Sequence, residues 1–581
     1  MGKIPSIRLS GKPARPRNSF DVSERALYTQ PVGSILPVFV RDLNPGDHLE
    51  VNAASLLQAQ TLKGRAFFNG KQKFAGFFVP YKQLWNGWES FITRLNPAFT
   101  SVSSKFMDTI PITRATGGDY FVKGFAPNKV PSFSPYTLLA EMWKIREDAT
   151  LKAANNPFVS DIFGVRAVDN YARLMEHLGY GSATPFLDSS ASTLPVGDSA
   201  KLSMSLFRFA AYQKIYQDYY LDDVFEVRNP FAYQLDAYEE GGAPGPNLVA
   251  NAKNADNKTN LRGAMFQMRY AHYEKDILSN LTPTLLDISN TGTTGLPALG
   301  YNHNVGLNST ISSPYTMGQG GAISADELRA LFALDKMYQI SSRAGKSYKE
   351  QIAAHYGEDV RNLVDSCYYC GGFDKNLAVD AVIATAAGQV PDISDSMLGQ
   401  QSGFIDSSNS GSITCDAKDF GVFMIVSYVS VEPRYSLGID DFVNKLVASD
   451  YFHPEYEELG LQPVLAMRYG HDGGKRSLDD LNKVVSWQPR YSEYKSSYNK
   501  LYGPYAGGGN LSFLTPEKTF KLDLTEKKFS FDMFLVSPRS LDRTVEINYD
   551  GQAKTDPFRV ETHFAATLIS NMGVTGLPRL I

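Results

Sequence analysis

The chain has 581 residues, of which 43% are hydrophobic and 20% are charged, a composition that predicts a folded protein with a large core. Its net charge of −4 argues against a protein that neutralises nucleic acid over its whole surface, so any DNA contact would be local or would need a basic partner. Three cysteines are too few for a disulfide framework, and no uncharged apolar run reaches the length of a transmembrane helix.

The first 20 residues predict an extended basic arm, because they contain three prolines and no acidic residue. Five positive charges lie in this segment, at Lys3, Arg8, Lys12, Arg15 and Arg17. A solvated terminus without a ligand has the same composition, so the pattern alone leaves both functions open.

Antiparallel strands are predicted from the end of the arm to residue 80. An apolar run meets the turn sequence NPGD, in which Pro45 presets φ and Gly46 tolerates a positive φ. Further on, Asn69-Gly70 lies between two Phe-rich runs and predicts a hairpin turn.

Helical spacing begins after these strands. Leu84, Trp88, Phe91 and Leu95 recur at intervals that predict one helix. Residues 96–200 are mixed and show no repeat.

The stretch LFRFAAYQKIYQDYYLDD, residues 206–223, contains four tyrosines, two phenylalanines and two basic residues. Phe209, Tyr212, Tyr216 and Tyr219 recur at i, i+3, i+7 and i+10, which places them on one face of a helix. Rings beside cations suit a platform for single-stranded nucleic acid, and they suit equally a helix packed in a core or at a subunit contact. Packing is the simpler interpretation.

The second half of the chain returns to strands after long polar segments. Residues 238–262 and 279–322 are rich in Gly, Asn, Ser and Thr and predict surface loops, and SADE at 324–327 predicts the start of a helix. Strand patterns follow at 420–433, 529–538 and 556–570. Strands at both ends predict a mainly β fold, a single β-sandwich over residues 21–581 with large helical and loop insertions at about 96–200, 238–322 and 324–412.

Candidate catalytic and metal motifs fail in their context. The sequence RAGKSYKE lacks the first glycine of a P-loop, because Ile340 occupies that position. The cysteines of CYYC, Cys367 and Cys370, have the spacing of metal ligands but lack a second pair. We therefore predict no catalytic residue, no metal site and no cofactor.

Six segments follow one another in an order that is itself informative: SFDVSERALYTQPVGSILPVFVRDLNPGD, FAGFFVPYKQLWNGWESF, LFRFAAYQKIYQDYYLDD, MRYAHYEKDILSNLTPT, ISADELRALFALDKMYQISSRAGKSYKEQIAAHYG and VSWQPRYSEYKSSYNKLYG. In this order they resemble the major capsid proteins of the Microviridae, small single-stranded DNA bacteriophages, in their gokushovirus and alpavirus-like groups. The resemblance covers most of the chain and departs from the family pattern at Leu206, where relatives have proline, and at Trp487-Gln488-Pro489.

This resemblance implies an eight-stranded antiparallel viral jelly roll that assembles through pentamers into a T=1 icosahedral shell around circular single-stranded DNA. It further implies assembly in the cytoplasm of a bacterial host, and as partners a small basic DNA-binding protein, a pilot protein and a host receptor. The five cations of the basic arm would then contact the DNA. A soluble jelly-roll protein that binds carbohydrate is the alternative, and particle mass distinguishes the two.

Overall fold

The computed structural model describes residues 17–60, 62–64, 66–93, 130–147, 160–182, 202–222, 226–237, 264–281, 333, 336–337, 340, 353–357, 366–377, 379–383, 401–436, 438–446, 448–457, 460–470, 481–520, 522–523, 528–529, 533–545 and 556–574. The helix predicted from SADE begins outside them. The whole loop at 238–262 and residues 282–322 of the second loop also lie outside them.

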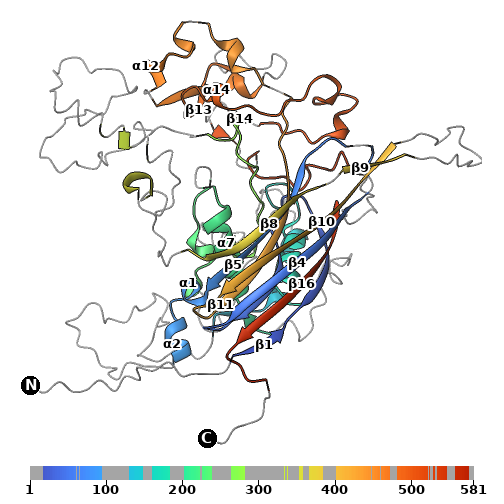
Figure 1. Ribbon diagram of the computed structural model, residues 1–581, viewed down its shortest axis with the longest axis vertical. Coiled ribbons are helices and arrows are strands. Elements are labelled where there is room, and N and C mark those ends of the chain that lie inside the picture. The colour runs from blue at the N-terminus through green and yellow to red at the C-terminus, as the bar shows by residue number, and fades with distance from the viewer. Residues whose placement is uncertain are drawn as a thin grey trace, which may run out of the picture.

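Two antiparallel sheets form the centre of the molecule (Figure 1). The first has the strand order β1–β16–β4–β10–β9, with β2 also paired to β16, and the second has the order β3–β11–β5–β8. The strands of the first sheet are β1 (Asn18–Asp21), β2 (Glu24–Gln30), β4 (His48–Ala59), β9 (Val379–Ile383), β10 (Gln401–Asp416) and β16 (Phe558–Ser570). The strands of the second sheet are β3 (Leu36–Leu43), β5 (Gly70–Pro80), β8 (Tyr368–Asn376) and β11 (Gly421–Val431).

The strand order is that of an eight-stranded jelly roll. β1 and β2 pair with successive halves of β16 and so form one interrupted edge strand, while β9 pairs only with the first five residues of β10. The eight main strands then divide equally, with β2, β4, β10 and β16 in one sheet and β3, β5, β8 and β11 in the other. The predicted mainly β sandwich is confirmed.

The predicted turns had different outcomes. Gly46 has a φ of 91°, as the NPGD turn requires, and this turn carries the chain from one sheet to the other. The hairpin predicted at Asn69-Gly70 is wrong, because β5 begins at Gly70 and pairs with β11 and β8. The Phe-rich run before Asn69 does not pair with β5. It contacts the segment between β11 and β16 instead, where the Phe67 amide donates to the Leu514 carbonyl (2.8 Å).

The first insertion, residues 81–367, connects β5 to β8 and contains most of the helices in the described part of the chain. The single helix predicted around Trp88 is two short helices, because the chain is extended at Trp85. The described elements are α1 (Tyr81–Leu84), α2 (Trp88–Thr93), β6 (Ser132–Phe133), α3 (Pro135–Glu147), α5 (Ala167–His177), β7 (Met204–Ser205), α7 (Phe207–Ile215), the π-helix η4 (Tyr216–Tyr220), η5 (Pro230–Ala232), η6 (Leu235–Ala237) and η7 (Ala264–Phe266).

The second insertion, residues 432–557, connects β11 to β16 and lies with α12, α14 and β13 at the end of the molecule opposite β1 (Figure 1). Its elements are η9 (Asp441–Asn444), η10 (Ala448–Asp450), α12 (Pro454–Glu457), β12 (Leu461–Leu465), η11 (Ala466–Tyr469), β13 (Val484–Pro489), α14 (Ser492–Lys495), η12 (Gly503–Tyr505), η13 (Ser512–Leu514), β14 (Leu522–Asp523) and β15 (Lys528–Phe529).

These elements correct the predicted division of the chain. The range 324–412, predicted as an insertion, includes β8, β9 and most of β10, which belong to the sheets. The insertion at 432–557 had been assigned to the sandwich. The predicted strand at 529–538 contributes only the end of β15 and one isolated bridge from Leu535 to His272 within the described residues.

The inserted helices cover one sheet and leave the outer face of the other exposed. α7 packs against β5 and β11, and α5 packs against β3. Nearly every side chain of β11 is buried, whereas β4 and β16 alternate between buried and exposed side chains. Between the sheets, Phe39 of the covered sheet contacts Phe564 of the other at 5.3 Å between ring centroids. None of the helices in the described part of the chain has both the length and the apolar character that a membrane span needs.

Candidate functional site

The aromatic stretch forms α7 and the π-helix η4. The buried side chains of α7 include five apolar ones. They lie on more than one face of the helix, which is typical of a helix inside a core. The π-turn is closed by the Leu221 amide and the Tyr216 carbonyl (2.8 Å), and it interrupts the regular helical face. Tyr219 is therefore 45% exposed, whereas Phe209, Tyr212 and Tyr216 are at most 2% exposed. The prediction that all four rings share one face is wrong at Tyr219.

Phe209 lies at the centre of a cluster of rings from the first insertion. Its ring centroid is 5.0 Å from that of Tyr180, 5.3 Å from Phe266 and 5.5 Å from Phe133. These separations fall in the range of favourable aromatic pairs, so Phe209 joins the helices of this insertion to one another.

The Tyr212 hydroxyl connects the first insertion to the barrel, the name used from here on for the two sheets of the jelly roll together. This group donates to the Ile35 carbonyl (2.9 Å) and accepts from the Arg269 amide (2.9 Å). Burial raises the pKa of Tyr212, so the ring stays neutral and remains a donor at physiological pH. The contact fixes the start of β3 against residues 264–281.

Tyr216 and Tyr219 make different contacts at the end of the stretch. The Tyr216 hydroxyl donates to Glu226 (2.7 Å), and the Arg269 guanidinium lies 4.9 Å from its ring centroid. Tyr219 packs on Phe77 of β5 (4.8 Å between centroids) and donates to the Cys367 carbonyl (2.7 Å). Neither Tyr212 nor Tyr216 exposes a face to a base, and the role of these rings in assembly stays a prediction.

Both cations of the stretch are engaged within the chain. Lys214 and Asp218 form a buried ion pair (3.0 Å), and Asp218 also accepts from the Cys367 amide (2.9 Å). Arg208 pairs with Asp42 (3.1 Å). A platform for single-stranded nucleic acid needs cations that can reach phosphates, so these pairs favour packing as the function of the stretch.

The basic arm is described only at its last cation. Arg17 is exposed and donates to the carbonyl of Gly46, in the turn between β3 and β4. Lys3, Arg8, Lys12 and Arg15 lie outside the described residues. Contact between the arm and DNA therefore stays a prediction.

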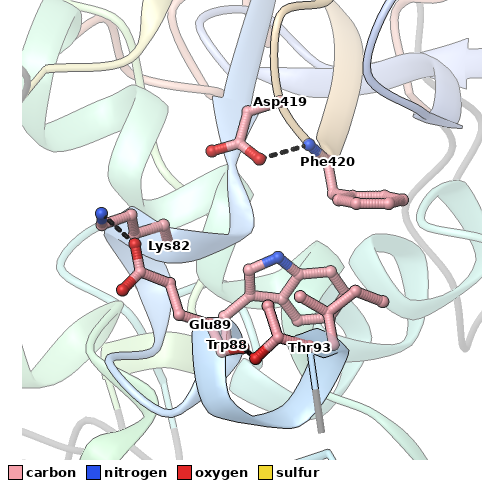
Figure 2. Close-up of a pocket in the computed structure, with 7 residues that line it drawn as sticks. Lys82, Trp88, Glu89, Thr93, Asp419 and Phe420 are labelled. Atoms are coloured by element: carbon pink, nitrogen blue, oxygen red, sulfur yellow. Dashed lines mark hydrogen bonds and ion pairs between the residues drawn. The ribbon is translucent and has the colours of Figure 1, made fainter. Parts of the chain in front are cut away.

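A hollow of about 470 Å³ lies where β5 leads into α1 (Figure 2). Lys82 forms an ion pair with Glu89 in it, and the Asp419 carboxylate accepts a hydrogen bond from the Phe420 amide (2.7 Å). Trp88 forms its apolar wall. Sequence patterns identified only the helical spacing of Trp88 here, because Asp419 and Phe420 come from a turn more than 300 residues away.

The described residues contain no arrangement that suggests chemistry. Among them, no group of three or more His, Cys, Asp or Glu side chains is placed to hold a metal ion. The three cysteines are free, and burial raises the pKa of Cys367, which makes it a poor nucleophile.

Comparisons with known proteins give consistent results. The sequence model of a family described as "Capsid protein (F protein)" matches residues 11–122 and 186–580. The capsid protein VP1 of Chlamydia phage 1 is 22% identical over 556 residues, covering 86% of this chain and 87% of the relative. The capsid protein VP1 of Bdellovibrio phage phiMH2K is 22% identical over 532 residues, covering 87% of this chain and 84% of the relative.

Proposed function

The chain belongs to the F-protein family of phage capsid proteins, and we propose from this membership that its copies close into a T=1 icosahedral shell around circular single-stranded DNA. A structural role in the virion follows from the family itself. The eight-stranded jelly roll carries the proposal, because this fold is common in viral shells. Lectins share the fold, so the fold alone does not distinguish a shell protein from a carbohydrate-binding protein. The mass of the assembled particle and its DNA content do.

DNA would be held locally rather than over the whole inner surface. With a net charge of −4, the chain offers the basic arm as its concentrated source of positive charge. The arm has five cations, Lys3, Arg8, Lys12, Arg15 and Arg17, and Arg17 keeps its charge although one of its N–H groups donates to the Gly46 carbonyl. Four phosphate contacts on a single strand give a slope of about −2.8 for log affinity against log salt, and a fifth contact would give about −3.5.

Other virion components complete the proposal. A small basic DNA-binding protein would neutralise the phosphates that the arm does not reach, and a pilot protein and a host receptor would serve entry. Assembly in the bacterial cytoplasm agrees with three free cysteines, since disulfides are rare in reducing compartments.

The test is to express the full chain in bacteria, alone and with a small basic DNA-binding protein of a related phage. We expect closed particles of megadalton mass that protect circular single-stranded DNA from nuclease. A monomer or small oligomer in both preparations would contradict the shell. Deletion of residues 1–16 should leave closed shells with less DNA, and unchanged DNA content would contradict the role of the arm.

A further inference from the structure

Exposed apolar side chains gather in the second insertion, far from the barrel. Exposed apolar residues scattered singly are normal on a protein surface, but a contiguous group marks an interaction site. Leu446 is 83% exposed and Val443 is 70% exposed, although both are aliphatic. We call the following group the distal patch: Phe442, Val443, Leu446, Tyr451, Phe452 and Tyr494.

The rings of the distal patch hold one another in place. Tyr494 contacts Phe442 edge to face at 5.0 Å and Phe452 at 6.4 Å between centroids. Beneath them lies Tyr491, which is buried and is the one non-glycine residue with a positive φ among those described (61°). Its amide donates to Gln462 (3.0 Å). A surface ordered in this way loses little side-chain entropy on binding.

A buried ion pair supports the same rings. Lys445 and Glu493 are both buried and lie 2.8 Å apart. The Lys445 ammonium is 3.9 Å from the centroid of Tyr494, and Glu493 also accepts from Gln462 (2.8 Å). This charge is therefore used inside the patch and is not presented to a ligand.

The surrounding charges argue against nucleic acid as the partner. Residues 440–457 and 490–500 contain six acidic and four basic residues, a net charge of −2. Lys495 and Lys500 are each paired with a carboxylate at 2.6 Å. Phosphates need accessible cations, and this surface is acidic with its lysines paired.

The same charges argue against contact between two identical patches. Two copies meeting patch to patch would bring like charges together, which is unfavourable at an interface. Aliphatic side chains as exposed as Leu446 and Val443 suit the dry centre of a protein interface. A partner protein with a different, less acidic surface fits both observations.

We propose that the distal patch docks on a different surface of a second copy of this chain. The inference rests on the proposed shell, in which each subunit needs heterologous contacts with its neighbours. The position of the patch suits that role, because the second insertion lies at the end of the molecule opposite β1, away from the strands of the two sheets (Figure 1).

The test is the variant Leu446→Asp with the matched control Leu27→Asp. Leu27 is 81% exposed on β2, at the edge of the barrel, so both substitutions replace an exposed leucine with a carboxylate. We expect Leu446→Asp subunits to melt at the wild-type temperature but to give roughly tenfold fewer closed shells, since a charge in an apolar contact weakens it at every symmetry-related position. The control should assemble normally.

Each other outcome would overturn the inference. If the wild-type chain never forms shells, the proposed function fails and the docking surface fails with it. If wild-type and Leu446→Asp shells close equally well, only the docking surface fails, and loss of host adsorption by those shells would assign the patch to a receptor. Equal loss of shells in both variants would also overturn the inference, because the loss would then follow from any added charge and not from the position of the patch. Val443→Ser, at a patch residue that is 70% exposed, provides a second, uncharged variant for which we expect the same loss with unchanged melting.

Discussion

The two sheets of the jelly roll differ in what lies on their outer faces. β11, in the sheet covered by α7 and α5, reads GVFMIVSYVSV and is buried along almost its whole length. β4, in the other sheet, reads HLEVNAASLLQA and alternates between buried and exposed side chains. A strand covered on both faces is continuously apolar, and a strand with one solvated face alternates. The first insertion is therefore part of the core, because without it one face of β11 would meet water.

The uncovered face has the composition of a solvated surface. On β10 the outward residues between 408 and 414 are Ser408, Ser410, Ser412 and Thr414, all small and polar. Substitutions that probe the two faces should accordingly differ greatly in cost.

The largest effect is expected inside the first insertion, in the π-helix that follows α7. Tyr216→Ala should lower the free energy of unfolding by about 3–5 kcal/mol, because it removes a buried ring and its hydroxyl bond to Glu226. Leu56→Ala on β4, which is partly exposed, should change it much less, by about 1 kcal/mol. Urea unfolding of dissociated subunits measures both.

The same variant distinguishes packing from DNA contact. Loss of closed particles in Tyr216→Ala agrees with packing. A normal number of particles with reduced DNA would show that the ring stacks on bases, and would contradict the structural role.

A pH effect of about 3 kcal/mol is expected at His177, where α5 meets the barrel. Burial lowers the pKa of His177 to about 4, and its Nδ1 lies 2.8 Å from the Pro37 carbonyl. The unfolded chain takes up the proton near pH 6.5, so stability is lost as the pH falls from 6.5 towards 4. His272 has a similarly lowered pKa of about 4 and adds to the same loss.

Unfolding in urea at pH 7 and at pH 4.5 tests this expectation. His177→Gln keeps a possible donor to Pro37 and should flatten the pH dependence, whereas His563→Gln, on the exposed face of β16, should leave the slope unchanged. Equal slopes in all three proteins would refute the assignment to His177.

Removal of single tyrosine hydroxyls should have smaller effects on the free energy of unfolding. Tyr212→Phe leaves the buried Ile35 carbonyl without its partner and should cost about 1–3 kcal/mol. Tyr219→Phe should cost only about 0.5–1.5 kcal/mol, because water can reach this half-exposed site. Thermal unfolding of the two variants orders them, and a larger loss for Tyr219→Phe would reverse the interpretation of the π-turn.

The smallest effect is expected on the uncovered face itself. Ser410→Val on β10 should change the free energy of unfolding by no more than about 0.5 kcal/mol, because the side chain is exposed and valine suits a strand. Val426→Ser on β11, which is fully buried, should cost several times more. Similar losses would show that the uncovered face is packed in the isolated subunit.

Several parts of this fold could be predicted from local patterns. The strands at 420–433 and 556–570 have apolar runs or alternation that belong to strands wherever they pair, and both correspond closely to β11 and β16. Gly46 was predicted because a turn with positive φ favours glycine. The order of family segments in the sequence supplied the capsid role.

Which strands pair, and which side chains are buried, were decided only by the tertiary structure. Asn69-Gly70 has the local signature of a hairpin, yet β5 pairs with β11, about 350 residues further along the chain. β8 was missed because its sequence, YYCGGFDKN, has two glycines and little apolar alternation, and its place at the edge of the sheet comes from pairing with β5. Tyr219 left the buried face because the helix changes to a π-turn where it meets Phe77 and Cys367. Local sequence determines which segments favour strand or helix, because backbone preference and side-chain periodicity act over a few residues. Partners and burial depend on surfaces that meet only when distant segments pack.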